Sequence, residues 1–241
     1  MTTPPTRRER VRAATVEEIK QTARALLVKD GVAGMSLRAI AREMGMVPAA
    51  LYRYFPNLEA LMEAVTGDLY DDTRGHLERA RDAVTSGDPG DRLVAVCRAF
   101  RRWALEHPAE FGVMFGTPLP LDGSTYLDPD HADNPVHQAG DRFATVFSAL
   151  FAEIWMRSPF PVPAPDEVAP ALRDQLQAYV DRMPVPVPVG AAQVALSCWI
   201  RLYGMIALEA YGHLHFALTD PEPMFEVELA SGLRRLGVTA R

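Results

Sequence analysis

The sequence predicts an all-α protein, with a small N-terminal helical domain followed by a larger helical body. Apolar residues recur at spacings of three and four along most of the chain, which is typical of helices with one buried face. Glycine and proline divide these patterns into separate segments, and no stretch alternates convincingly enough to predict a strand. With 241 residues, of which 48% are hydrophobic, the chain can form one large or two small domains with a substantial core.

A first helix is predicted from about Thr15, or a few residues earlier, to about Lys29. Thr15 and Glu18 fit a capping box, in which each residue satisfies a free backbone N–H at the helix start. Gly31 ends the helix. Its apolar face is formed by Ile19, Ala23, Leu26 and Leu27.

Residues 1–10 precede this helix and are polar, with prolines and several arginines. We expect them to form a flexible basic arm. This arm is either a solvated tail or a segment whose Arg7 and Arg8 meet DNA phosphates or enter a minor groove.

Two short helices follow, separated by a glycine. Ser36 is a good N-cap for the first, and Gly45 lies where a left-handed C-terminal cap is expected. Pro48 suits the first turn of the second helix, and Pro56 stops it. This spacing is that of a helix-turn-helix unit, whose second helix can enter a DNA major groove.

The remaining helices form the body. A long helix is predicted from Leu58 to about Ala83 and a very apolar one from Gly190 to Gly212, which must be covered on most sides. Phe111 to Phe115 is at best a short apolar turn of helix, and residues 116–135 are predicted to be a loop. Further helices are expected over residues 91–107, 136–157, 167–181 and about 221–236.

The charge is distributed unevenly between the two parts. Residues 1–60 contain ten Lys/Arg and six Asp/Glu, a net charge of +4, whereas the remainder contains 15 against 25, a net charge of −10. The total of −6 therefore conceals a basic head on an acidic body. A modular DNA-binding protein shows this distribution because phosphate contacts need only local positive charge.

Other classes of protein find little support in the sequence. No run of 18 apolar residues lacks charges and no secretory signal is visible, so we expect a cytoplasmic protein with no membrane span. Cys97 and Cys198 are expected to be buried free thiols. His213 and His215 lack further ligands at suitable spacing, so no metal is expected. Without a nucleophile, phosphate-binding or dinucleotide motif, neither an enzyme nor a cofactor is predicted.

The segment from Ser36 to Leu61 resembles the N-terminal domain of TetR-family transcriptional regulators. It reads SLRAIAREMGMVPAALYRYFPNLEAL, and a helix of suitable length precedes it. The segment WIRLYGMIALEAYGHL, from Trp199 to Leu214, resembles part of the interface helix of many actinobacterial members. The resemblance implies a homodimer formed through residues 190–212 and 221–236, a ligand cavity in the body and a palindromic operator. Repression is the usual activity of the family.

The resemblance also implies roles for individual residues. Ser36 and Arg38 stand where family members contact phosphate, and Tyr52 and Tyr54 stand at positions on or close to DNA. The recognition helix begins with Val47, Pro48, Ala49 and Ala50.

Two residues depart from the family pattern. The family usually has a Ser or Thr cap at Val47 and a phosphate-binding lysine at Leu58. The recognition helix is also poor in polar groups, so hydrogen-bonded base reading would have to come from Arg53, Tyr52 or Arg38. Val47 and the alanines offer methyl groups, whose natural partner is the thymine methyl. We therefore expect apolar contacts and DNA shape to contribute heavily to specificity.

Aromatic and apolar side chains of the body are candidates for an effector site, although each of them also fits plain core packing. The residues around 111–115 lie beside a proline-rich loop, where the mouth of a cavity is expected, and the composition favours an apolar or aromatic effector. The candidates are Trp103, Phe111, Met114, Phe115, Phe147, Phe151, Trp155 and Tyr203.

Taken together, these features predict a DNA-binding domain over residues 1–60 and a regulatory and dimerisation domain over residues 61–241. The predicted function is that of a ligand-responsive transcriptional regulator, with repression as the expected activity. Two alternatives stay open. One is a dimeric helical scaffold or sensor with weakened DNA binding, as Val47 and Leu58 suggest. The other is a helix-turn-helix protein of another kind, such as a recombinase accessory domain, although the acidic residues form no catalytic arrangement.

Overall fold

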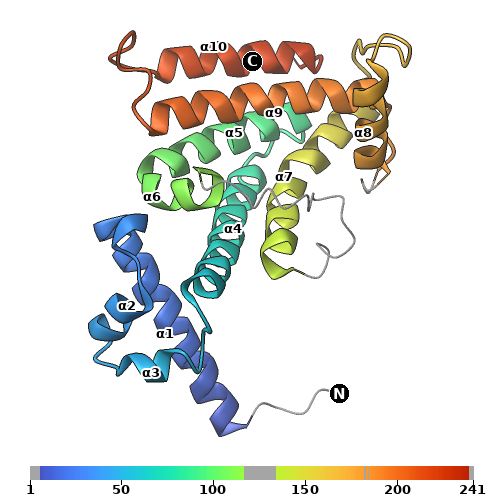
Figure 1. Ribbon diagram of the computed structural model, residues 1–241. Coiled ribbons are helices and arrows are strands. Elements are labelled where there is room, and N and C mark those ends of the chain that lie inside the picture. Colours follow the sequence, from blue (N-terminus) through green and yellow to red (C-terminus); the bar gives the residue numbers. More distant parts are fainter. Residues whose placement is uncertain (1–5, 117–133, 182, 184, 239–241) are drawn as a thin grey trace. The chain divides into compact units, whose positions relative to one another are not determined.

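The computed structural model describes residues 6–116, 134–181, 183 and 185–238, and these residues form helices and no strand (Figure 1). The predicted all-α class is confirmed. The described residues group into two compact units, one within residues 1–70 and 109–119 and the other within 71–108 and 120–241. The helix α4, Leu58–Asp82, begins in the first unit and ends in the second. The boundary predicted at residue 60 thus falls near the start of α4, and the division of function there stays a prediction.

The first unit contains three further α-helices before α4: α1 (Arg7–Asp30), α2 (Leu37–Glu43) and α3 (Pro48–Leu51). A short 3-10 turn, Val32–Gly34, connects α1 to α2. α2 packs against both α1 and α3. The core of the unit consists of fully buried side chains from all four helices, among them Ile19, Leu27, Ile40, Leu51 and Leu61.

The start of α1 differs from the prediction. The helix begins at Arg7, with Thr6 as N-cap, and the capping box pairs Thr6 with Glu9 instead of Thr15 with Glu18. The Thr6 backbone N–H donates to the Glu9 carboxylate at 2.7 Å. Residues 7–10 are therefore helical and not part of a flexible arm. The prediction failed because the first two turns of α1 are exposed on all sides, so no apolar stripe marks them as helix.

The turn between α2 and α3 has the predicted caps. The Ser36 hydroxyl accepts the backbone N–H of Ala39 at 3.1 Å. Gly45 has a φ of +64°, a left-handed conformation that a residue with a Cβ rarely adopts. The N–H of Met46 donates to the Ala41 carbonyl at 2.8 Å, which closes the end of α2. The sequence therefore specifies this helix-turn-helix geometry locally.

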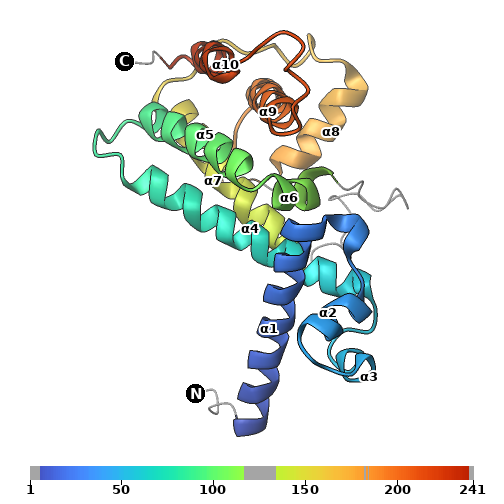
Figure 2. The ribbon, with the colours of Figure 1, turned by 90° about the vertical axis from the view of Figure 1, so that its left-hand side faces the viewer.

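The second unit is built around α9, Val189–Ala210. This helix packs against α5 (Pro89–Glu106), α8 (Pro170–Val180) and α10 (Glu222–Arg235). Figure 2 looks nearly along α9 and α10, which lie side by side, while α5 packs against α7 (Pro135–Arg157). α6 (Pro108–Phe111), which belongs to the first unit from Ala109 onward, continues into a π-helical turn, Gly112–Gly116, as expected for the short apolar segment. The predicted loop 116–135 lies mostly outside the described residues.

α9 starts against a proline-rich segment. A Cβ added to Gly190 would overlap the carbonyl oxygen of Pro163, so only glycine permits this close approach. Proline cannot continue a helix, and residues 159–163 accordingly carry no regular secondary structure. The glycine thus explains how an extended proline segment packs directly on the first turn of α9.

α9 is also long and apolar enough to cross a membrane when judged by length and composition alone. Its most apolar 18-residue window has a mean hydropathy of 1.4, and 28% of that window is buried within the chain. The expectation that no segment could span a membrane was therefore too strong as a statement about composition. α9 packs on three other helices, and a single helix of this composition is weak evidence for a membrane span.

Candidate functional site

The second helix of the helix-turn-helix unit buries one face and exposes the other. Leu51 is fully buried and Phe55 is 8% exposed, so these two side chains anchor the segment. In contrast, Val47 is 69% exposed and Tyr52 is 52% exposed. The other predicted base-reading residues, Pro48, Ala49 and Arg53, are exposed as well, and Ala50 and Tyr54 are half-buried. The predicted reading surface is thus available to a ligand as large as DNA.

The starts of α3 and α4 lie at the two positions, Val47 and Leu58, where the sequence departs from the family pattern. No side chain caps the start of α3, because Val47 stands at the N-cap. The Asn57 side-chain oxygen accepts the Ala60 backbone N–H at 2.8 Å and so caps α4. Its amide group keeps two N–H donors, which can serve phosphate in place of the lysine missing at Leu58. The start of this long helix also carries the positive end of the helix dipole.

Further phosphate-binding candidates lie on α1 and α2. Arg7 and Arg8 are exposed on the first turn of α1, and Arg38 is exposed on α2. The Ser36 hydroxyl accepts one bond as a cap and keeps its own O–H to donate. The structure therefore presents all of the predicted phosphate-binding side chains at the surface of the first unit.

The second unit contains an apolar cavity of about 290 Å³. It is bounded by α5, α7, α8, α9 and α10, with aromatic side chains from α7 and α9 as its largest lining groups. The lining residues are Leu93, Cys97, Phe143, Ala144, Phe147, Ser148, Phe151, Tyr179, Met183, Ala192, Ala195, Leu196, Cys198, Trp199, Arg201, Leu202, Met205, Phe225, Glu228, Leu229, Gly232, Leu233 and Leu236.

The aromatic wall of the cavity is centred on Trp199. Its ring lies edge-on to Phe147, with the centroids 5.3 Å apart, and edge-on to Phe143 at 6.3 Å. It also lies nearly parallel to the rings of Phe100, at 5.9 Å, and of Tyr203, at 6.1 Å. Such packing fixes the rings, so the wall is preformed and suits another flat or apolar group.

The polar groups among the described lining residues leave no net charge for a ligand. Arg201 and Glu228 form an ion pair at 3.3 Å. The Cys198 thiol lies 3.8 Å from the Gly232 carbonyl oxygen, to which it donates weakly. Burial raises the pKa of Cys97 to about 12 and also raises the pKa of Cys198, so both thiols are neutral at physiological pH. The cavity therefore favours an uncharged occupant.

Only part of the predicted effector set lines this cavity. Phe147 and Phe151 do, whereas Tyr203 does not line the cavity and stacks on Trp199. Trp155 packs on Phe160 with centroids 5.0 Å apart. Trp103 lies against His107 at 5.3 Å.

The three remaining members of the set belong to the first unit. Phe111, Met114 and Phe115 pack near Tyr70 of α4, whose hydroxyl donates to the Met114 carbonyl at 3.0 Å. The Tyr70 and Phe115 rings lie 5.8 Å apart. These contacts give the three residues packing partners, and their role in an effector site stays a prediction.

Sequence reasoning missed several lining residues, most of them on α9 and α10. Trp199 carries the aromatic wall, and Ala192 and Ala195, small residues seven and four positions before it on α9, line the same cavity. The apolar character of α9 on nearly every side was visible in the sequence. That pattern cannot distinguish a side chain packed in the core from one that borders a cavity. The spacing Phe143, Phe147, Phe151 was the stronger available signal, because it places three rings on one face of α7.

No metal site accompanies the cavity or the DNA-binding surface: within the described ranges, no group of three or more His, Cys, Asp or Glu side chains is arranged to hold an ion. His213 lies beside the Tyr211 ring, with centroids 6.2 Å apart, at the end of α9.

An exposed second helix in a helix-turn-helix unit, joined to a larger helical unit with an apolar cavity, defines a DNA-binding transcriptional regulator. Residues 12–65 match the family model described as bacterial regulatory proteins of the tetR family. Residues 93–231 match the model of the tetracyclin repressor-like C-terminal domain. The chain belongs to the TetR family of transcriptional regulators, a family of DNA-binding proteins and not of enzymes.

Individual relatives are similar over nearly the whole chain. The HTH-type transcriptional regulators Mb1846 of Mycobacterium bovis and Rv1816 of Mycobacterium tuberculosis are each 31% identical over 226 residues, which cover 92% of this chain and 90% of theirs. The crystal structure of the protein SCO4313 is similar with a TM-score of 0.68 and 31% identity, covering 95% of this chain and all of that one.

Proposed function

We propose that the protein acts in the cytoplasm as a homodimeric repressor that binds a palindromic operator and is released by a small apolar or aromatic effector. The observation that carries this proposal is that one helix, α9, has two different apolar faces. One face lines the cavity through Trp199 and Ala195, and the other presents exposed apolar side chains to the outside. An effector in the cavity therefore touches the helix that we expect to hold two copies together.

The outward face of α9 forms a continuous stripe. Ile200 and Leu208 are 59% and 43% exposed and lie in one row at helical spacing. Leu196, which is 40% exposed, lies at the edge between the two faces, because it also lines the cavity. Gly204 falls in the same row, and a Cβ there would meet nothing within 4 Å, so another backbone can approach closely. Val227 on the neighbouring α10 is 58% exposed. Contiguous apolar surface of this kind marks an interface in a soluble protein.

The oligomeric state tests this interface. The chain has a mass of 26.6 kDa, so a homodimer has twice that mass. Light scattering at micromolar concentration should show the dimer for the unaltered protein and the monomer for Ile200→Glu, because a buried unpaired carboxylate is costly. Val28→Glu is the matched control, since Val28 is 57% exposed on α1 and lies outside the stripe. If the unaltered protein is a monomer under these conditions, the proposed homodimer is wrong.

The chemistry of the cavity supports an uncharged effector. Since Arg201 and Glu228 neutralise each other and the remaining described lining is largely apolar, an ionised ligand would lose its water without gaining a free counter-charge. The probe pair 2-naphthol and 2-naphthoate checks this by competition with the neutral dye Nile red. We expect naphthol to displace the dye at concentrations at least tenfold lower than naphthoate.

A cavity-filling variant then separates effector binding from folding. Ala195→Phe places a ring in the cavity and should weaken Nile red binding at least tenfold. Ala149→Phe, at an exposed position on α7 outside the cavity lining, is the control and should bind the dye like the unaltered protein. If Ala195→Phe binds the dye unchanged, this cavity is not the effector site. In a screen for compounds that release operator DNA, the same variant should fail to respond.

Binding of an effector would act by favouring a shape of the second unit in which the two DNA-binding units no longer fit both half-sites. Repression is the direction that we infer, in keeping with the tetracyclin repressor-like family model. Deleting the gene should raise transcription from promoters that the protein binds, and an unchanged or lower transcript level would contradict repression.

The alternative of a dimeric scaffold with weakened DNA binding rests on two residues. α3 has no side-chain cap at Val47, and Leu58 cannot bind phosphate. A gel-retardation assay with the DNA upstream of the gene, at low salt, separates the two functions. Retardation supports the regulator, and complete absence of retardation favours the scaffold.

A further inference from the structure

Arg12 of α1 reaches the end of the recognition segment, although 41 residues separate the two in sequence. Its guanidinium donates a hydrogen bond to the backbone carbonyl of Arg53 at 3.3 Å. The same group lies over the Tyr54 ring, with its central carbon 5.1 Å from the ring centroid. One side chain therefore holds two consecutive residues, one through the backbone and one through a cation–π contact.

The recognition segment has few other means of fixing its end. α3 is one turn long and has no side-chain cap at its start. A single turn of helix is not stable alone, so its orientation depends on contacts with the rest of the unit. After Leu51 the chain continues as turns, with the N–H of Tyr54 donating to the Leu51 carbonyl at 2.9 Å. Leu51 and Phe55 are anchored in the core, and the three residues between them carry the side chains predicted to face DNA.

We propose that Arg12 is a positioning residue for DNA reading, which fixes the turn formed by residues 52–54 and thereby the directions of the Tyr52 and Arg53 side chains. Its positive charge is directed at the Arg53 carbonyl and the Tyr54 ring. A rigid guanidinium fork suits this double task better than an ammonium group, because it donates in its plane and stacks with its face.

This role differs measurably from a phosphate contact. A phosphate contact strengthens binding to every DNA sequence. It also makes the fall of log affinity with log salt concentration steeper by about 0.9. A positioning residue changes how well the operator is distinguished from other DNA, because it acts on the side chains that meet the bases. The two roles can therefore be separated on one protein with two DNA duplexes.

The experiment compares Arg12→Ala, Arg12→Lys and Arg8→Ala for binding to two duplexes over a range of salt concentrations. One duplex is the site recovered by selection with the unaltered protein, and the other is a shuffled sequence of the same composition. Arg8 lies on the same helix, is exposed and is predicted to contact phosphate, so Arg8→Ala removes an equal charge and is the matched control.

For Arg12→Ala we expect operator affinity to fall about tenfold, the sum of one hydrogen bond and one exposed cation–π contact. Affinity for the shuffled duplex should fall less than threefold, and the salt slope should stay within about 0.5 of the original value. Arg12→Lys should recover less than half of the loss on a logarithmic scale. Arg8→Ala should instead weaken both duplexes alike and lower the salt slope.

The Tyr54 ring supplies a second line of test. Tyr54→Phe keeps the ring and loses the hydroxyl, so any phosphate contact of that hydroxyl is lost on both duplexes alike and the ratio of operator affinity to shuffled-duplex affinity should stay the same. Tyr54→Leu removes the ring under Arg12 and should lower that ratio. In the Tyr54→Leu background, Arg12→Ala should cost less than it does alone, which shows that the two residues act together. Thermal unfolding of each variant separates positioning from loss of fold, and Arg12→Lys serves if Arg12→Ala does not fold.

Two results would overturn the proposal. The first is an equal loss on both duplexes with a lower salt slope for Arg12→Ala, accompanied by full rescue with lysine, which is the behaviour of a phosphate contact. The second is unchanged operator discrimination in Arg12→Ala, whatever the result for Tyr54→Leu.

Discussion

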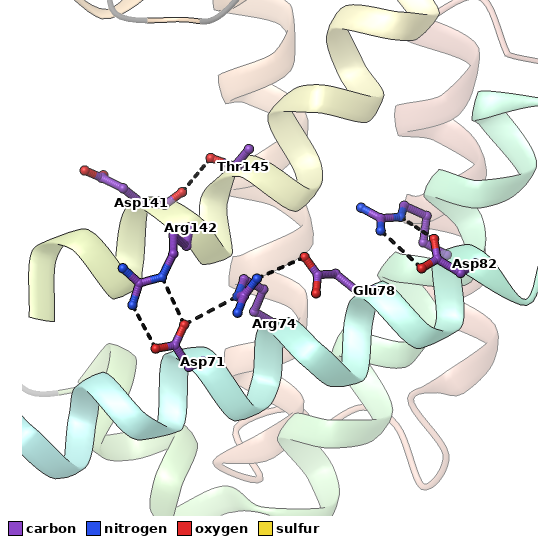
Figure 3. A network of polar contacts seen from close by, with 8 residues as sticks. Asp71, Arg74, Glu78, Asp82, Asp141, Arg142 and Thr145 are labelled. Atoms are coloured by element: carbon purple, nitrogen blue, oxygen red, sulfur yellow. Dashed lines mark hydrogen bonds and ion pairs between the residues drawn. The ribbon is translucent and has the colours of Figure 1, made fainter. Parts of the chain in front are cut away.

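Arg142 of α7 and Asp71 of α4 form a two-pronged ion pair, with hydrogen bonds of 3.1 and 2.8 Å from the guanidinium to the two carboxylate oxygens (Figure 3). Arg74 lies 3.4 Å from the same carboxylate and 3.2 Å from Glu78. Phe143, the residue after Arg142, lines the cavity. α7 therefore connects the cavity wall directly to α4, the helix that begins in the DNA-binding unit.

This pair should matter little for stability. Arg142 and Asp71 are 46% and 40% exposed, so water and salt screen their attraction. Arg142→Met should lower the free energy of unfolding by less than about 1 kcal/mol at neutral pH, measured by urea titration. A loss of several kcal/mol would show that the pair has a larger role in the packing of α7 on α4.

The same pair predicts a pH dependence with a definite sign. Hydrogen bonds from Arg142 hold the pKa of Asp71 below its ordinary value of 3.8. Because the folded pKa is lowered, the contribution is present above the unfolded value and disappears as the pH falls through the folded value. The stability difference between the unaltered protein and Arg142→Met should therefore shrink as the pH falls below the ordinary carboxyl value of 3.8. A difference that grows on acidification would contradict the assignment.

A second ion pair, between Arg101 and Glu209, should contribute much more to the free energy of unfolding than the exposed pair. Arg101 and Glu209 are only 14% and 6% exposed, and their two hydrogen bonds measure 2.8 and 2.6 Å. Arg101→Met leaves the Glu209 carboxylate buried without its partner, so unfolding should be easier by about 3 kcal/mol or more. Arg98→Met is the matched control. Arg98 also lies on α5 and pairs with Glu226, but its side chain is 55% exposed. This substitution should cost less than about 1 kcal/mol in the same urea titration.

The two thiols report on the cavity. Burial raises the pKa of Cys97 to about 12, and Cys97 is 4% exposed, so its reaction with iodoacetamide at pH 8 should be very slow. Cys198 is less buried and should react first, although more slowly than a free thiol. Because both thiols line the cavity, saturating 2-naphthol should slow the labelling of Cys198. Mass spectrometry of the labelled peptides measures the order, and faster labelling of Cys97 would contradict it.

Base reading by methyl groups is a further prediction for the exposed start of α3. Val47 and Ala49 carry no hydrogen-bonding groups, so their natural partners are thymine methyls. Val47→Ser and Ala49→Ser should each change the preferred bases in a binding selection, and Val47→Ser should also stabilise the unit by about 1 kcal/mol through a new cap. If neither substitution changes the preferred sequence, specificity does not depend on these methyl contacts.

The parts of the fold that the sequence predicts best are those fixed by local chemistry. Ser36 and Gly45 each determine a helix end, the first through one hydrogen bond and the second through one backbone conformation, and both act as predicted. The start of α1 was placed too late because an exposed helix has no apolar stripe, and a capping box at Thr6 begins it instead.

The site was harder to predict than the fold. Periodicity shows which face of α7 or α9 is apolar, yet the same pattern fits a ring packed in the core and a ring that borders a cavity. Trp199 and Phe147 line the cavity because α8 and α10 close around α9, and that arrangement depends on contacts between distant segments. Arg12 was missed for the same reason, since its partners lie 41 residues away and nothing in the local pattern connects them.

The most direct test of the whole account is a selection of genomic fragments bound by the purified protein, followed by sequencing. A two-fold dimer with one helix-turn-helix unit per copy predicts an enriched sequence with two inverted half-sites, their centres about one helical turn of 10 base pairs or more apart. Enrichment of a single half-site without dyad symmetry, or of no sequence at all, would contradict it.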